Sequence, residues 1–309
     1  MNVLTLSGIS KRYKSVTALS DVSFTVPEGS VFGILGPNGS GKTTLLGIVT
    51  DVLRASAGSY KFFDGSQPVN EIRKEMGVLL ETPNFYPYLS ARQNLEIVAK
   101  IKGCDYSNID PTLKKVNLFD RRFSSFKTFS LGMKQRLAIA STLLNNPGII
   151  ILDEPTNGLD PEGISEIRQL IKQLSNEGKT VILASHLLDE VEKVCTHVAI
   201  LKKGKLLVYG DVGGALSGES SGNESTLPAK QTVMIEVGSE NMGTLTDVLK
   251  TLSGVLDINQ SDNLVTISHY EGELTPEEVN KYCFEHGVVL NRLIAKNKNL
   301  ESKFLEITK

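Results

Sequence analysis

The sequence has no long apolar run. None approaches the ~20 consecutive apolar residues that a membrane-spanning helix requires. The opening residues, MNVLTLSGISKR, also have no apolar core behind a basic start, as a secretion signal would. These two absences predict a cytoplasmic protein that cannot cross a membrane by itself.

Cysteine is scarce as well. The chain has three cysteines, Cys104, Cys195 and Cys283, which are far apart and lack the spacing of a metal site. An odd number of distant cysteines suits a reducing compartment, where thiols stay free. We therefore expect buried or unreactive thiols.

Neither sign of charge is in large excess. Lys and Arg together number 33 and Asp and Glu 35, so the overall charge favours neither nucleic acid nor an anionic membrane as a partner. The 309 residues are 40% hydrophobic and 22% charged, which is typical of a soluble chain of about two domains. The function must therefore come from local sites.

The first two thirds of the chain alternate short apolar runs with helical patterns. The runs at 30–36, 148–154 and 180–186 are rich in Ile, Val and Leu and predict strands buried on both faces. Such alternation indicates an α/β fold with a largely parallel sheet, which binds ligands at the carboxyl ends of its strands.

A change in composition marks a domain boundary after residue 212. Between 213 and 225, eight of thirteen residues are Gly or Ser, and such a segment cannot bury enough apolar surface to order itself. We therefore expect a first domain at 1–212, a linker at 213–230 and a small accessory domain at 231–309.

The accessory domain has its own pattern of strands and helices. The expected order is strand 232–237, helix 242–252, strand 255–260, strand 264–269, helix 276–286, strand 288–295 and a last helix. The first six form the β-α-β-β-α-β order of a ferredoxin-like α+β unit. Thr275, Pro276 and Glu278 predict a capping box and a preset first turn for the second helix.

A glycine-rich segment, GPNGSGKTT, follows the first apolar strand and opens a helix. It matches the phosphate-binding pattern G-x-x-x-x-G-K-[ST], in which backbone amides surround a β-phosphate and a lysine reaches the β- and γ-phosphates. A chance glycine turn is the competing interpretation, and the strand, the helix and the eight-residue spacing together argue against it. The predicted nucleotide-binding residues are Gly36, Pro37, Asn38, Gly39, Ser40, Gly41, Lys42, Thr43 and Thr44.

Two further strands end in chemically active side chains. IIILDEP places Asp153 and Glu154 at a strand end, where Asp153 would hold Mg²⁺ and Glu154 would polarise an attacking water. Thr43 is expected to be a second Mg²⁺ ligand. The run VILASH ends in His186, which we expect to contact a γ-phosphate, although a single histidine is more often structural.

The segment FSLGMKQR predicts a helix start that no strand precedes. Apolar positions at helical spacing follow it, so Ser130 is the expected N-cap and Gly132 lies in the first turn. A helix start offers free N–H groups to an anion. The phosphate loop lies elsewhere in the chain, so this helix has no nucleotide of its own to hold.

Together these motifs resemble the ATP-binding subunit of an ABC transporter. The family pattern appears in order over residues 1 to about 212 as the phosphate loop, a glutamine-loop position at Glu81, a signature at 129–133, the acidic strand, a D-loop at 157–160 and the histidine. The resemblance implies ATP and Mg²⁺ as cofactors and Glu81 as a metal ligand. It also implies that Tyr13 stacks on adenine, although a single Tyr beside a strand often only packs.

The resemblance implies a head-to-tail homodimer. Ser130 and Gly132 of each copy would cap the γ-phosphate bound by the other copy. The signature helix would thus hold the partner's phosphate. Asp160 would act in the D-loop, and it would also cap the helix that begins with Pro161. Both roles are compatible.

Three residues depart from the family pattern. Leu131 replaces a signature glycine and would be strained if that position required a positive φ. Met133 removes a side-chain amide. Glu81 replaces an amide by a carboxylate, which can still ligate Mg²⁺ but adds negative charge beside ATP. Drug- and antibiotic-export subunits of the family often carry similar signatures, so we expect these changes to be tolerated.

The resemblance also implies the partner and the place of action. Residues about 84–145 would form a helical subdomain that meets a separate membrane permease on the inner face of the cell membrane. The aromatics of NFYPYLS would either contact that permease or pack inside the subdomain. A lone cassette with a small α+β tail is more similar to exporter subunits, of drugs, antibiotics or lipids, than to nutrient importers.

Two other functions compete with transport. Soluble ABC-type ATPases act on ribosomes or DNA, but the former carry two cassettes and the latter long coiled coils, and neither feature is present here. A nucleotide-dependent regulator would not need Glu154 and His186. The sequence does not indicate which substrate is transported.

Overall fold

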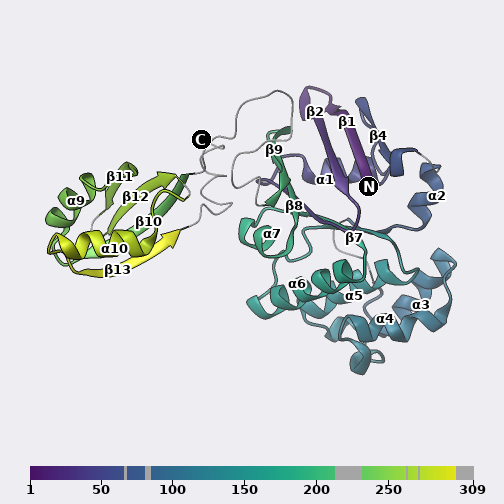
Figure 1. Ribbon diagram of the computed structural model, residues 1–309. Coiled ribbons are helices and arrows are strands. Elements are labelled where there is room, and N and C mark those ends of the chain that lie inside the picture. The colour runs from purple at the N-terminus through teal and green to yellow at the C-terminus, as the bar shows by residue number, and fades with distance from the viewer. Residues whose placement is uncertain (66–67, 81–84, 213–231, 262–263, 271, 297–309) are drawn as a thin grey trace. The chain divides into compact units, whose positions relative to one another are not determined.

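The computed structural model describes residues 1–309 except 66–67, 81–84, 213–231, 262–263, 271 and 297–309 (Figure 1). The chain divides into two compact units, Met1–Val212 and Gly213–Lys309. The first unit ends at the residue where the sequence analysis places the end of the first domain. The glycine- and serine-rich linker, the last expected helix and Glu81 lie outside the described residues.

The first unit is built on a sheet of six strands. They are β3 (Val31–Leu35), β5 (Gly77–Leu79), β6 (Ile149–Asp153), β7 (Thr180–Ser185), β8 (His197–Lys202) and β9 (Lys205–Asp211). Their order is β5-β6-β7-β3-β8-β9, and all neighbours run parallel except β9, which is antiparallel to β8. The three expected buried strands are confirmed as β3, β6 and β7. Their carboxyl ends therefore meet at one edge of the sheet.

Helices cover the two faces of this sheet. One face receives α1 (Lys42–Val49), and the other α6 (Pro161–Asn176) and α7 (Leu188–Val194), while α2 (Val69–Lys74) packs near β4 (Figure 1). The contact of α7 is close because Gly33 of β3 has no side chain. A Cβ there would lie 2.8 Å from Val191 Cγ1 and 2.9 Å from Cys195 Sγ.

A three-stranded antiparallel sheet lies over α1 and was not predicted from the sequence. It consists of β1 (Asn2–Tyr13), β2 (Val16–Pro27) and β4 (Ala57–Phe62) in the order β2-β1-β4, and the short 3₁₀ helix Phe63–Gly65 follows β4. Apolar residues of this sheet, such as Leu6 and Val26, share one core with α1 and with Phe32 of β3. The glycine-rich loop therefore leads from β3 into a helix that packs between two sheets.

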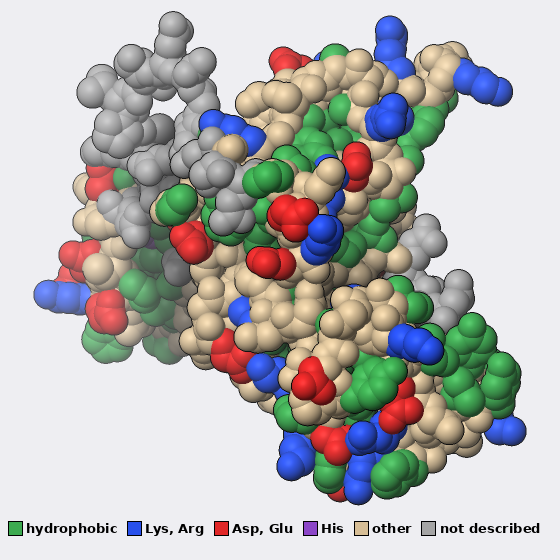
Figure 2. All heavy atoms as spheres, turned by 90° about the vertical axis from the view of Figure 1, so that its right-hand side faces the viewer, with side chains coloured by type: hydrophobic (Ala, Val, Ile, Leu, Met, Phe, Trp, Pro, Cys, Tyr) green, Lys and Arg blue, Asp and Glu red, His purple; other side chains and the backbone are tan. Residues whose placement is uncertain are grey.

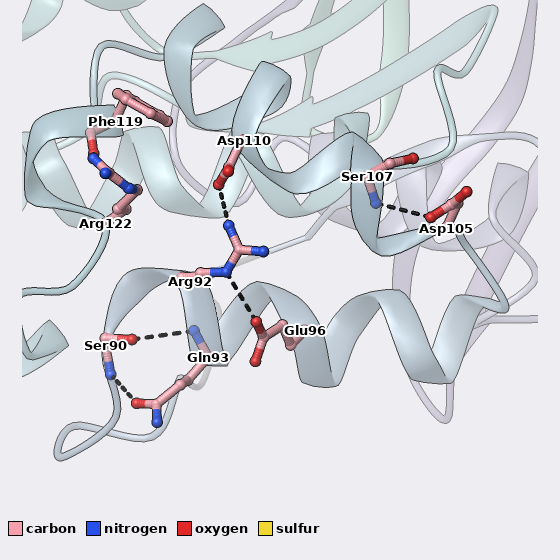
Figure 3. Close-up of polar contacts among 9 residues, drawn as sticks. All are labelled: Ser90, Arg92, Gln93, Glu96, Asp105, Ser107, Asp110, Phe119 and Arg122. Carbon is pink, nitrogen blue, oxygen red and sulfur yellow. Dashed lines mark hydrogen bonds and ion pairs between the residues drawn. The ribbon is translucent and has the colours of Figure 1, made fainter.

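Short helices form the lobe expected near residues 84–145. They are α3 (Ala91–Lys102), α4 (Ile109–Lys115) and α5 (Leu131–Leu143), with 3₁₀ turns at Tyr106–Asn108, Phe119–Arg121 and Phe126–Thr128. Arg92 of α3 joins this helix to α4, because its guanidinium contacts Asp110 of α4 (Figure 3). The same guanidinium also contacts Glu96, within α3, at 3.0 Å. The Arg122 guanidinium lies 3.9 Å from the centre of the Phe119 ring.

The second unit has the expected strand and helix order. Its elements are β10 (Thr232–Ser239), α9 (Met242–Lys250), β11 (Val255–Ser261), β12 (Leu264–Tyr270), α10 (Pro276–Glu285) and β13 (Leu290–Lys296). The sheet is antiparallel in the order β11-β12-β10-β13, so the β-α-β-β-α-β prediction is confirmed. Its core holds Ile235, Ile267, Leu245 and Val279, all fully buried.

The three thiols are free. Burial raises the pKa of the Cys195 thiol to about 12 and also raises the pKa of Cys283. Both groups are therefore protonated and unreactive at neutral pH. No helix among the described residues has the length and apolarity needed to span a membrane.

Replacing Thr275 with Ala should destabilise the second unit alone. Thr275 N donates to Glu278 Oε2 at 2.8 Å, and Glu278 N donates to Thr275 Oγ1 at 3.2 Å, so the expected capping box of α10 is present. Losing the hydroxyl should lower the free energy of unfolding by about 1 kcal/mol. Urea unfolding measures it, with Thr275→Ser as the matched control. Equal stability of both variants and the wild type would contradict this role.

Candidate nucleotide site

The glycine-rich loop takes backbone conformations that favour glycine. Gly39 has φ +77° and Gly41, the N-cap of α1, has φ +104°, and other residues rarely adopt such values. A Cβ on Gly36 would lie 2.3 Å from the Leu201 carbonyl oxygen, so no larger residue fits there. The loop runs directly into the first turn of α1, whose N–H groups have no partner within the helix.

Lys42 is buried at the start of α1. Its Nζ donates to the Gly36 carbonyl at 2.8 Å and to the Pro37 carbonyl at 3.4 Å, and it lies 3.2 Å from Glu154 Oε1. One ammonium group thus connects the glycine-rich loop with the end of β6. It is placed to exchange these oxygens for those of a phosphate.

Glu154 connects Lys42 with His186. Its second carboxylate oxygen, Oε2, is 2.8 Å from His186 Nδ1, and in the tautomer with Nδ1–H the ring donates this hydrogen bond. Glu154 has φ +48°, a conformation that costs free energy for a residue with a side chain. Such strain is typical of functional sites, and here it accompanies the sharp turn that follows β6.

The expected metal ligands have the right chemistry for Mg²⁺. Asp153 is buried at the end of β6, and Thr43 is exposed in the first turn of α1. No three His, Cys, Asp or Glu side chains among the described residues cluster so as to hold a metal on their own. A hydroxyl and a carboxylate fit Mg²⁺, which keeps several waters and takes phosphate oxygens as further ligands.

The signature segment starts a helix as predicted. Ser130 is the N-cap of α5, and its hydroxyl accepts from Met133 N at 3.3 Å. Leu131 is the first helical residue and is not among the residues with positive φ, so its replacement of glycine causes no such strain. Ser130 and Leu131 are both exposed. The helix start is therefore open to an external anion.

The start of α5 lies against the start of α6. Arg136 of α5 pairs with Glu166 of α6 at 3.3 Å. A Cβ on Gly158, in the expected D-loop, would lie 3.4 Å from Leu131 Cδ2. Asp160 Oδ1 accepts from Gly163 N at 3.1 Å, so its capping role is confirmed. The signature and the D-loop are thus neighbours within one chain.

The predicted residues fall into separate groups. Direct contacts join the glycine-rich loop, Lys42, Glu154 and His186, whereas Ser130 and Asp160 belong to the α5–α6 pair. Tyr13 ends β1 and is 43% exposed, with Lys11 Nζ 4.9 Å from its ring centre. Its exposed ring is available to stack on a base. Its contact with Lys11 is with another residue of β1 and does not link Tyr13 to the glycine-rich loop.

Gly204 supports the glycine-rich loop and was missed in the sequence analysis. It lies in the turn between β8 and β9 with φ +78°, and its N–H donates to the Ser40 carbonyl at 3.0 Å. Its carbonyl accepts from Ser20 N at 2.8 Å. The sequence signal is the glycine in KKGK between two short apolar runs. It indicates a turn but does not identify the segment that the turn contacts.

Comparisons with known proteins agree with this geometry. The family model described as ABC transporter matches residues 19–157. The chain is 37% identical to an uncharacterized ABC transporter ATP-binding protein, YhcH of Bacillus subtilis, over 99% of this chain and 96% of that protein. It is 38% identical to the lantibiotic transport ATP-binding protein SrtF of Streptococcus pyogenes, over 74% of this chain and all of that protein.

A solved structure shares the fold of the first unit. It is the dimeric post-hydrolysis state of the ATP-binding cassette MJ0796, bound to ADP and Pi, with 28% sequence identity and a TM-score of 0.60. The match covers 67% of this chain and 98% of the cassette.

Proposed function

The chain belongs to the ATP-binding proteins of ABC transporters, and we propose that it binds Mg²⁺-ATP between two copies of itself to drive a separate membrane permease. The observation that carries this proposal is the contact chain from Lys42 through Glu154 to His186 at the end of three neighbouring strands. It joins a phosphate-binding cation, a carboxylate and an imidazole in one place. Phosphoryl transfer to water requires such groups around the γ-phosphate.

Each group has a proposed role in hydrolysis. The amides of 36–44 hold the β-phosphate, Lys42 binds the β- and γ-phosphates, and Tyr13 stacks on adenine. Glu154 accepts a hydrogen bond from the attacking water, and His186 contacts the γ-phosphate. Thr43, Asp153 and Glu81 would hold Mg²⁺, which neutralises charge on the phosphate oxygens.

The second copy completes the site in this proposal. Ser130 is exposed at the start of α5, so the free amides of this helix can meet a phosphate bound by the other copy. The dimeric state of the similar cassette supports this arrangement. Asp160 lies beside the same surface and would act across it.

The permease surface is proposed at the aromatic segment before α3. Phe85 packs on Phe126 with ring centres 5.2 Å apart, whereas Tyr86 and Tyr88 are 48% and 71% exposed. Hydrophobic side chains gather on this side of the helical lobe (Figure 2). The two interpretations of NFYPYLS thus divide by residue. Phe85 packs inside the lobe, and the tyrosines remain available to a partner.

Replacing Tyr86 and Tyr88 with Ser should uncouple the chain from its permease. Each tyrosine offers a large contact area at low entropic cost, so copurification with the permease should fall at least about tenfold. The ATP affinity of the isolated chain should not change, because neither side chain touches the glycine-rich loop. Tyr106→Ser, also exposed at 47%, is the control. Normal copurification of the double variant would place the contact elsewhere.

The transported compound is proposed to be a peptide antibiotic, with export as the direction. Support comes from SrtF, which is named for lantibiotic transport. The chain would act at the inner face of the membrane, held there by the permease. The second unit carries no phosphate loop and, in its described residues, no paired acids at strand ends, so we assign it to dimer association or partner docking and not to hydrolysis.

A further inference from the structure

Two neighbouring helices follow the two catalytic loops. The turn that carries Glu154 leads through Asp160 into α6, and His186 stands just before α7, which begins at Leu188. The helices α6 and α7 contact each other on the same face of the sheet (Figure 1). A displacement of one helix against the other would therefore change the distance between the Glu154 and His186 loops.

One partly buried ion pair joins these two helices. Arg168 Nε of α6 lies 3.4 Å from Glu190 Oε2 of α7, and the two side chains are 25% and 13% exposed. Neither atom has a hydrogen-bond partner in the described part of the chain, so their mutual contact is the interaction that offsets the burial of these two atoms. By contrast, Lys193 and Asp189 form an exposed pair within α7, with side chains 52% and 68% exposed.

The pair lies directly behind the catalytic loops. Residues next to Glu154 and His186 share a small cavity with the pair, and the cavity is lined in part by Pro155, Thr156, Arg168, Leu183, Ser185 and Glu190. Ser185 Oγ accepts from Leu187 N at 3.0 Å, which fixes the turn around His186. A shift of Arg168 or Glu190 would therefore disturb residues next to both Glu154 and His186.

We propose that Arg168 and Glu190 are positioning residues that hold His186 against Glu154 by fixing α7 to α6. This inference rests on the roles assigned to Glu154 and His186 in the proposed function. The pair lies away from Lys42 and the glycine-rich loop, which hold the β-phosphate in the proposed function, so we expect it to act mainly on the catalytic step. A small misplacement of reacting groups is enough to slow a reaction strongly.

The test is a double-mutant cycle on steady-state ATP hydrolysis by the full-length protein. Glu190→Gln keeps the shape of the side chain and removes its charge, and it should lower kcat about tenfold with KM for ATP unchanged. Arg168→Met should have the same effect. Because the residues act as a unit, the double variant should also lose only about tenfold and not about a hundredfold.

Two controls separate positioning from general destabilisation. Lys193→Met removes the exposed pair on the same helix and should keep wild-type kcat. The exchange Arg168→Glu with Glu190→Arg restores opposite charges and should recover part of the lost kcat. Thermal unfolding, recorded for every variant, ensures that rates are compared below the transition. If Arg168→Met does not fold, Glu190→Gln and Arg168→Lys carry the test.

The outcomes distinguish this inference from the proposed function. A folded Glu190→Gln variant with wild-type kcat would overturn the positioning role, as would multiplicative losses in the double variant. If Glu154→Gln loses turnover in the same assay while Glu190→Gln does not, the inference alone fails. If Glu154→Gln retains turnover, the catalytic assignment itself fails.

Discussion

Glu154→Gln should lower kcat for ATP hydrolysis by about 10²- to 10⁴-fold, the usual contribution of a general base. The amide keeps the shape of the side chain and the turn after β6 but cannot accept a proton from water. The ion pair with Lys42 Nζ at 3.2 Å is also lost, which leaves the lysine free to bind phosphate. ATP affinity should therefore stay the same or increase.

The variant should accumulate as an ATP-bound dimer. Gel filtration with Mg²⁺-ATP should show a dimer peak that the wild type loses as it hydrolyses the nucleotide, and phosphate release gives kcat. Glu162→Gln, in the exposed first turn of α6, is the matched control and should behave as wild type. Wild-type turnover by Glu154→Gln would contradict the assignment of Glu154 as the group that activates the attacking water.

Lys42→Ala should instead weaken ATP binding itself. A hydrogen bond from an ammonium group to a charged oxygen contributes about 1.5–3 kcal/mol, so affinity should fall by about 10- to 100-fold. Titration calorimetry with ATP measures the change. Lys61→Ala, on an exposed position of β4, serves as the control.

The lysine variant also needs a check on folding. Lys42 donates to the carbonyls of Gly36 and Pro37, so its loss removes support from the loop as well as charge from the site. Thermal unfolding without nucleotide reports on that support. Unchanged affinity in a folded Lys42→Ala variant would show that the phosphates bind elsewhere.

Local patterns were enough to predict the local structure around the candidate site. Ser130, with apolar residues at helical spacing behind it, predicted a capped helix without any knowledge of tertiary contacts, because capping is a local interaction. The runs around 31–35, 149–153 and 180–185 predicted buried strands because their residues are apolar on both faces. The carboxyl edge of a parallel sheet then placed Glu154 and His186 near the glycine-rich loop.

The contacts between these groups could not be predicted in the same way. Strand order decides that β7 lies between β6 and β3, and periodicity within a strand does not encode the identity of its neighbour. The conformation of Glu154, with φ +48°, depends on the turn that the whole sheet edge imposes. The antiparallel sheet of β1, β2 and β4 was missed because bulges interrupt the alternation of its strands.

The turn that holds Gly204 connects the glycine-rich loop with the β8–β9 hairpin. The hairpin of β8 and β9 is hydrogen-bonded to the loop at one end through Gly204 N and the Ser40 carbonyl. At its other end, Val212 N donates to the Thr196 carbonyl at 2.9 Å, where the chain leaves the first unit. The β8–β9 hairpin therefore links the glycine-rich loop to the point where the chain leaves the first unit.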